Sequence, residues 1–175
     1  MVKLATPIPE EVKKFFVYSN GDLIRIAYPT RWGVKTSGEG IGKPVGHVST
    51  KGYLKVKFRE KALPVHRIIW FLVHGEMPVD MQIDHKDENK LNNHIDNLRL
   101  ATNGQNAAAR SDIGATNKTG VRNVYTVSGM KNTWQVNVSV NGKTNYFGSY
   151  KDLELAELVA TEARSKIHGE FANHG

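Results

Sequence analysis

The sequence contains no cysteine. Disulfide bridges and thiolate zinc sites are therefore excluded, and any metal ion must bind through oxygen or imidazole ligands. Long apolar runs are also missing: the longest covers residues 68–73, far short of the roughly 20 residues that a membrane-spanning helix needs. Because residues 1–11 carry no apolar stretch of the kind found in secretion signals, we expect a soluble, intracellular protein.

Acidic side chains are in deficit, with 17 Asp and Glu against 24 Lys and Arg, which gives a formal net charge of +7. Such an excess favours polyanionic partners such as nucleic acids. A basic protein without any ligand would have the same composition, so the net charge alone does not show that this protein binds a nucleic acid. The length of 175 residues and the hydrophobic content of 39% suffice for one domain or two small ones, and we expect two modest cores.

The N-terminal part is predicted to form antiparallel hairpins. Residues 15–26 read as two strands around Asn20-Gly21, a dipeptide that suits the positive φ values of a tight turn. Residues 28–44 are rich in Gly, Ser, Thr and Lys, and we expect them to form a long exposed loop that carries Arg31 and Trp32.

A second hairpin is predicted over residues 46–58, with its turn at Lys51-Gly52. Lys55 and Lys57 lie on one face and alternate with apolar residues on the other. A lysine face is usually a solvated surface, but beside the Arg31 loop it could follow a phosphate backbone.

Residues 65–74 are apolar nearly all round and are predicted to form a buried helix, with Pro64 at its start and Gly75 at its end. His66 and His74 stand near the two ends of this helix. We expect both to be packing or capping groups rather than metal ligands.

Residues 84–106 are too polar to be core, and they place an acid beside an imidazole, followed by amides at intervals. A short strand from residue 81 should deliver Asp84 and His85. After turn-forming residues, a second strand at 98–101 leads into a helix that starts at Thr102 or Asn103 and ends at residue 110, with Asn106 in its first turn. Oxygen ligands and a base that titrates near neutral pH are the parts of a metal-dependent phosphodiesterase.

Hydrolysis of a phosphodiester needs a base that acts on water and a cation at the leaving oxygen. The Asp84 carboxylate and the Asn106 amide oxygen would leave most of a magnesium shell open, and His85 would take the proton. Neighbours on a regular strand point to opposite faces, so a shared site requires the strand to end or bulge there. The alternative is a surface Asp-His dipeptide that precedes an Asn-rich loop by chance.

The C-terminal part is predicted to be a three-stranded sheet covered by one helix. Residues 111–119 are small and polar and read as a linker, and strands follow at 120–127, 133–140 and 143–150, the last two joined by Asn141-Gly142. The helix should run from Asp152, as its N-cap, to His168. An alternative for this half is a structural or protein-binding module.

Residues 65–67 and 83–87, together with Asn92-Asn93 and Asn97-Leu98-Arg99, closely resemble the HNH nucleases of phages and mobile introns, in the homing-endonuclease branch where Asn replaces the last His. The resemblance covers about residues 63–109. It implies a ββα-metal fold in which Asp84 and Asn106 bind Mg²⁺ or Mn²⁺. It also implies that His85 is the general base and that Asn97 holds the second strand and orients His85.

A second resemblance covers about residues 116–173. Gly120-Val121-Arg122, Trp134, Tyr146-Phe147-Gly148 and the alanine-rich helix resemble the AP2 DNA-binding domain of plant transcription factors. It implies that the outer face of the sheet enters a DNA major groove. The residues placed near DNA would be Arg122, Asn137, Ser139, Thr144 and Tyr146, and several of these positions are arginines in the plant relatives.

The sequence thus predicts an α+β protein: an HNH domain with N-terminal hairpins over 1–110, a linker over 111–119 and an AP2-like domain over 120–175. We expect a metal-dependent, sequence-tolerant homing endonuclease that leaves 5′-phosphate and 3′-hydroxyl ends on double-stranded DNA. One active site per chain favours a nicking monomer, located in the host cytoplasm if a phage encodes it. Alternatives are a non-catalytic DNA-binding regulator and a restriction or repair nuclease. Further DNA contacts are expected from Arg31, Lys55, Lys57 and Arg67.

Overall fold

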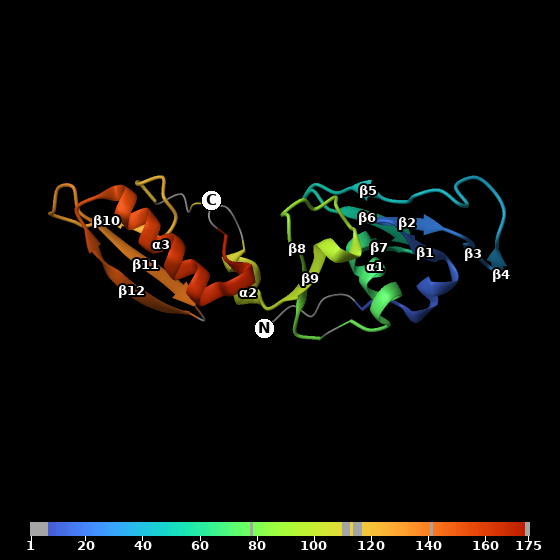
Figure 1. Cartoon of the computed structure of the whole chain (residues 1–175). Coiled ribbons are helices and arrows are strands. Elements are labelled where there is room, and N and C mark those ends of the chain that lie inside the picture. Colours follow the sequence, from blue (N-terminus) through green and yellow to red (C-terminus); the bar gives the residue numbers. More distant parts are fainter. Residues whose placement is uncertain (1–6, 78, 110–112, 114–116, 141, 174–175) are drawn as a thin grey trace. The chain divides into compact units, whose positions relative to one another are not determined.

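The computed structural model describes residues 7–77, 79–109, 113, 117–140 and 142–173. The chain divides into two compact units, Met1–Ala101 and Thr102–Gly175, which are described separately. The described residues form a mixed α/β structure with five small antiparallel sheets (Figure 1). No helix in the described ranges is both long and apolar enough to cross a membrane.

The first hairpin confirms its prediction. A short 3-10 helix, η1 (Glu10–Lys14), precedes β1 (Phe16–Ser19) and β2 (Asp22–Arg25), which pair antiparallel. The turn residues Asn20 and Gly21 have φ values of 45° and 91°, as a tight turn between twisted strands requires.

The expected loop over residues 28–44 is wrong in part. It contains a hairpin of β3 (Tyr28–Thr30) and β4 (Gly33–Lys35), and Pro44 bridges back to Ile24. The rest of the segment is largely exposed, as expected. The Arg31-Trp32 pair forms the tip of the hairpin, where Trp32 is 88% exposed.

A three-stranded sheet follows, made of β5 (His47–Val48), β6 (Leu54–Phe58) and β7 (Lys61–Pro64). The first two strands form the predicted hairpin. The third strand was not predicted, because Arg59 makes the β6–β7 turn at a positive φ of 52° without any turn-forming residue to announce it.

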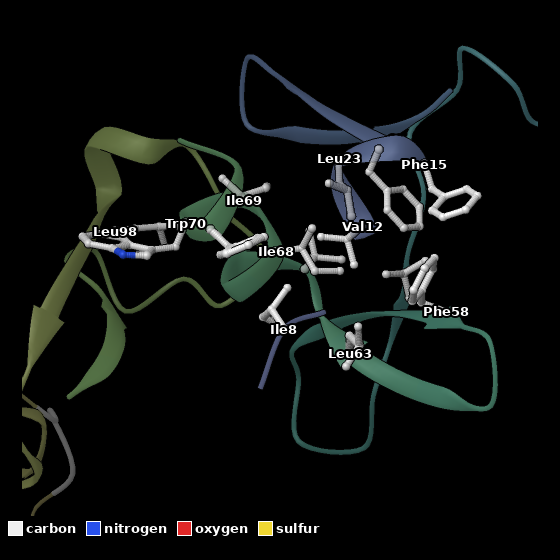
Figure 2. Packing of buried hydrophobic residues seen from close by; sticks show 14 of the residues in the cluster. Ile8, Val12, Phe15, Leu23, Phe58, Leu63, Ile68, Ile69, Trp70 and Leu98 are labelled. Atoms are coloured by element: carbon white, nitrogen blue, oxygen red, sulfur yellow. The ribbon is translucent and has the colours of Figure 1, made fainter. Parts of the chain in front are cut away.

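Helix α1 (Val65–His74) begins after Pro64 and ends at Gly75, whose φ of 81° lies in the left-handed region. One side of α1 supplies the centre of the first core. Figure 2 shows Ile68 and Ile69 among side chains of η1, β2 and β7. Val73 is 46% exposed, so the prediction of a helix buried all round is wrong for its last turn.

Strands β8 (Gln82–His85) and β9 (Leu98–Ala101) pair antiparallel, as predicted. The polar loop between them ends in the 3-10 helix η2 (Ile95–Asn97). Buried Leu98 joins β9 to the first core and lies beside Trp70 of α1 (Figure 2), so the polar loop leads directly into a strand that is held by the core.

The second unit begins with α2 (Asn103–Ala108), which Thr102 and Gln105 start with a reciprocal capping box. Its predicted end at residue 110 lies outside the described residues. Asn173 donates to the Ala109 carbonyl, which ties α2 to the second unit. The division between units therefore precedes the predicted boundary, and most of the predicted linker lies outside the described residues.

The rest of the second unit is the predicted sheet and helix: β10 (Val124–Thr126), β11 (Trp134–Val140), β12 (Lys143–Tyr150), α3 (Leu153–His168) and the 3-10 helix η3 (Gly169–Phe171). Asp152 caps α3 as predicted. Alanines 156 and 160 let α3 lie close to Val136 in a small core. Strand β10 is shorter than predicted because Thr119 and Asn117 bind the Val121 and Val124 carbonyls in a turn. The predicted turn residue Asn141 lies outside the described residues.

Candidate active site

His85 is the last residue of β8 and is only 4% exposed. Its Nε2 atom lies 3.1 Å from Oδ1 of Asn93, which is also buried. The Asn93 amide is oriented by a second hydrogen bond, in which Nδ2 donates to the Leu91 carbonyl at 3.2 Å. Because an amide oxygen only accepts, His85 must carry its proton on Nε2. The Nδ1 lone pair is then the one that can take a proton.

Two rings enclose the imidazole of His85. The centroid of His66, from α1, lies 5.2 Å away, and that of Tyr53, beside β6, lies 6.1 Å away. Burial lowers the pKa of His66 to about 3, with smaller contributions from His85 and Arg67. His66 is therefore uncharged at neutral pH and packs against His85, which confirms the packing role predicted for it.

Asp84 pairs with Arg99, directly opposite on β9. Both contacts reach the same carboxylate oxygen: Nε lies 3.0 Å and Nη2 2.9 Å from Oδ2. The two side chains are each 14% exposed, so the ion pair is largely shielded from solvent. Oδ1 takes no part in these two contacts.

Asp84 and His85 contact different partners, as neighbours on a regular strand should. Strand β8 ends at His85, and the Lys86 amide still donates to the Asn97 carbonyl in the register of the two strands. That Asp84 and His85 serve one site stays a prediction.

The loop after His85 is organised around Asp87. Its carboxylate accepts hydrogen bonds from the Asn89 amide and from the side chains of Asn92 and Asn97. Partial burial opposes ionisation, but the hydrogen bonds from Asn92 and Asn97 hold the pKa of Asp87 below its ordinary value. The asparagines thus build the loop that holds Asn93 against His85.

Asn97 was expected to orient His85. Its side-chain contacts are with Asp87 and Asn92, so its connection to His85 runs through the loop. Asn93 makes the direct contact, and sequence reasoning gave it no role. The only signal for Asn93 was its place in the motif that carries the resemblance.

Asn106 lies in α2 of the second unit and is half-buried. Its pairing with Asp84 across the two units stays a prediction. Among the described residues, no three His, Asp or Glu side chains gather into a metal-binding group. One carboxylate oxygen and one amide oxygen are hard ligands that suit Mg²⁺ or Mn²⁺ and need no such group.

The DNA contacts predicted in the first unit differ in exposure. Arg31 is exposed, and its guanidinium lies 5.1 Å from the Trp32 ring centroid. Lys57 is exposed beside Glu60, at 3.6 Å, whereas Lys55 and Arg67 are half-buried.

The DNA contacts predicted in the second unit lie on the sheet, except for Arg122. Ser139 and Thr144 are exposed and share a hydrogen bond of 2.9 Å, Asn137 is half-buried, and Tyr146 is 63% exposed. Arg122 instead points to the end of α2, where Nη2 donates to the Ala108 carbonyl at 3.0 Å.

Comparisons with known proteins find one matching family and two similar viral proteins. Residues 63–108 match a family described as HNH endonuclease. An uncharacterized HNH endonuclease of Acanthamoeba polyphaga mimivirus is 33% identical over 133 residues, which cover 75% of this chain and 67% of the relative. Protein 3.8 of Escherichia phage T7 is 32% identical over 112 residues, 64% of this chain and 90% of the relative. No solved structure matches the chain.

Proposed function

We propose that this chain, which belongs to the HNH endonuclease family, is a metal-dependent DNA endonuclease of the homing type, with an AP2-like DNA-binding module as its second unit. The observation that carries the proposal is the His85–Asn93 hydrogen bond, which leaves Nδ1 of a buried imidazole free to act as a base. The carboxylate next to it, fixed by Arg99, supports a metal role.

The residues that would hold the ion are Asp84 and Asn106, with water and substrate oxygens completing its shell. When bound, Mg²⁺ or Mn²⁺ supplies positive charge that stabilises the leaving 3′ oxygen. Arg99 cancels part of the Asp84 charge, so a moderate metal affinity is expected in the absence of DNA.

In the proposed reaction, His85 Nδ1 takes a proton from a water molecule as its oxygen bonds to phosphorus. The bond between phosphorus and the 3′ oxygen breaks in line with the attack, and the leaving oxygen gains a proton from solvent. The products are a 5′-phosphate and a 3′-hydroxyl. Asn93 and the loop around Asp87 keep the imidazole in place during this step.

The second unit supports a DNA role through the polar outer face of its sheet. Phosphate contacts would supply most of the affinity, and base contacts the sequence preference. A separate binding module raises the local concentration of the catalytic unit at its target, which suits an enzyme with a long, degenerate site.

The test is incubation of supercoiled plasmid with Mg²⁺. The parent should nick or linearise the plasmid, and His85→Ala should bind DNA without cutting it. His47→Ala, at an exposed histidine of β5, is the matched control and should cut like the parent. Equal inactivity of parent and His85→Ala, with DNA binding intact, would favour a non-catalytic regulator.

Cleavage by a homing enzyme also differs from that by a restriction or repair nuclease. Sequencing both strands at the cleavage sites should give a long, degenerate target. A short, strictly defined target would assign the chain to the restriction type instead.

A further inference from the structure

A cavity of about 390 Å³ lies within the second unit, between α2, the turn before β10, the sheet and the C-terminal end of α3. We call it the arginine cavity. Its lining includes Ala107, Arg122, Tyr125, Ser139, Arg164 and His168.

Arg164 is the most deeply placed of these, at 2% exposure. Its Nη1 donates to the Arg122 carbonyl at 2.8 Å and its Nη2 to Thr161 Oγ1 at 3.0 Å. The remaining donor, Nε, is buried and has no hydrogen-bond partner in the described part of the chain. Buried donors in folded proteins are nearly always paired, so Arg164 is an exception among the described residues, and it brings a positive charge to the lining of the cavity.

Arg122 also has a buried nitrogen without a hydrogen-bond partner in the described residues. Its Nη2 binds the α2 carbonyls, while Nη1 is buried without a partner among the described residues. Two guanidiniums thus line one cavity, and each has one nitrogen buried without a partner in the described residues. The lining residues that the structure describes include neither Asp nor Glu.

The positive potential of the cavity acts on its other ionisable groups. Burial, and then the charges of Arg122 and Arg164, lower the pKa of His168. Burial and the charge of Arg122 lower the pKa of Arg164, which Glu157 partly offsets from α3. Cations held together without a carboxylate among them favour an anionic ligand.

We propose that the arginine cavity binds a phosphate group on a sugar, either a phosphodiester of the DNA backbone or the phosphate of a free nucleotide. Guanidinium donors match phosphate oxygens in geometry and charge. The volume exceeds that of a bare phosphate and admits a nucleotide unit, and the partly exposed ring of Tyr125 offers a surface on which a base can stack. The DNA form of this inference rests on the proposed function, because Ser139 belongs both to the cavity and to the predicted DNA face.

His168 reports directly on the ligand. The full chain in EDTA, where no metal-dependent cleavage occurs, is titrated by NMR with thymidine 3′,5′-bisphosphate and, separately, with a short DNA duplex. A bound phosphate should raise the His168 pKa by about half a unit or more, because its charge offsets the two arginines. His168→Gln identifies the resonance.

Two variants of one exposed lining residue separate charge from bulk. Ala107→Glu and Ala107→Gln place side chains of equal size at the cavity, and the alanine that they replace has no side-chain hydrogen bond to lose. Ala107→Glu should weaken nucleotide binding about tenfold through charge repulsion, and Ala107→Gln by no more than about threefold.

The outcomes are distinct. A His168 shift with both ligands, with the duplex displacing the nucleotide, assigns the cavity to the DNA backbone, whereas a shift with the nucleotide alone assigns it to a free nucleotide. No shift with either ligand, or equal weakening by both Ala107 variants, would overturn the inference. Because the assay involves no cleavage, an inactive nuclease with a responsive His168 would reject only the proposed function.

Discussion

Asn93 fixes the tautomer of His85 through two hydrogen bonds, one to the ring and one to the Leu91 carbonyl. Without them, the proton could sit on either ring nitrogen and the ring could rotate. The nitrogen available as a base is therefore set by an amide eight residues away on the same loop.

Asn93→Ala should slow plasmid cleavage about 10- to 100-fold, which corresponds to the 1–3 kcal/mol cost of losing one partner of a buried hydrogen bond. Asn93→Asp keeps an acceptor facing Nε2 but loses the donor to the Leu91 carbonyl, so it separates the bond to His85 from the bond to Leu91. Single-turnover rates with DNA-binding affinities will separate a slower chemical step from weaker binding. Equal rates for Asn93→Ala and the parent would show that the bond has no positioning role.

Burial of His66 should make the stability of the folded protein depend on pH. Its pKa is about 3 when folded, below the ordinary value of 6.5, so the unfolded chain takes up a proton first as the pH falls. This residue should therefore remove stability from pH 6.5 down to about 3, with a slope of about 1.4 kcal/mol per pH unit.

Urea denaturation across that pH range measures the slope. In His66→Phe this contribution should vanish. The slope of the unfolding free energy against pH should therefore fall by the amount that corresponds to about one proton. Comparison of slopes avoids the absolute cost of the substitution. An unchanged slope in the variant would show that His66 does not stay neutral in the folded protein.

At the scale of elements, the hairpin of β3 and β4 presents Trp32 to solvent with Arg31 stacked beside it. A solvent-facing Trp beside a guanidinium is suited to stacking on bases. Trp32→Ala should weaken DNA binding about tenfold. Val34→Ala, which removes another exposed apolar side chain from the same hairpin, should leave it unchanged.

Tryptophan fluorescence checks this independently. Of the three tryptophans, Trp70 is only 9% exposed and Trp134 is half-buried, so iodide should quench chiefly Trp32 in the free protein, and DNA should protect it. Quenching that persists at saturating DNA would place the hairpin away from the duplex.

The same hairpin shows which elements could not be predicted from local sequence patterns. Elements with strong local signals were predicted closely: the Asn20-Gly21 turn, α1 between Pro64 and Gly75, and α3 after Asp152. Strands β3, β4 and β7 are only three or four residues long, and they pair with neighbours in sequence across two-residue turns whose central residues, Arg31-Trp32 and Arg59-Glu60, are not typical turn formers. Side-chain pairs such as His85 with His66 are tertiary contacts, so no local period reveals them.

At the scale of the whole molecule, we expect both units to bind the same DNA duplex. Lys57 of the first unit and Lys143 of the second are exposed lysines suited to phosphate contacts. Each lost contact should reduce the slope of log K against log salt by about 0.9. Lys57→Gln and Lys143→Gln should each reduce it, and the double variant by about twice as much.

Lys13→Gln is the control, because Lys13 lies over the Phe71 ring and is 2.6 Å from Glu10, a closer ion pair than that of Lys57 with Glu60 at 3.6 Å. Its salt slope should match that of the parent. A reduction by only one of the two test variants would mean that a single unit holds the DNA.

The most direct measurement is Mn²⁺ binding by electron paramagnetic resonance in the DNA complex of His85→Ala, where the substrate stays uncut. We expect one tightly bound Mn²⁺ per chain, with affinity reduced at least about tenfold when Asp84→Asn or Asn106→Ala is added. Unchanged Mn²⁺ affinity after either substitution would contradict the claim that Asp84 and Asn106 share one catalytic ion.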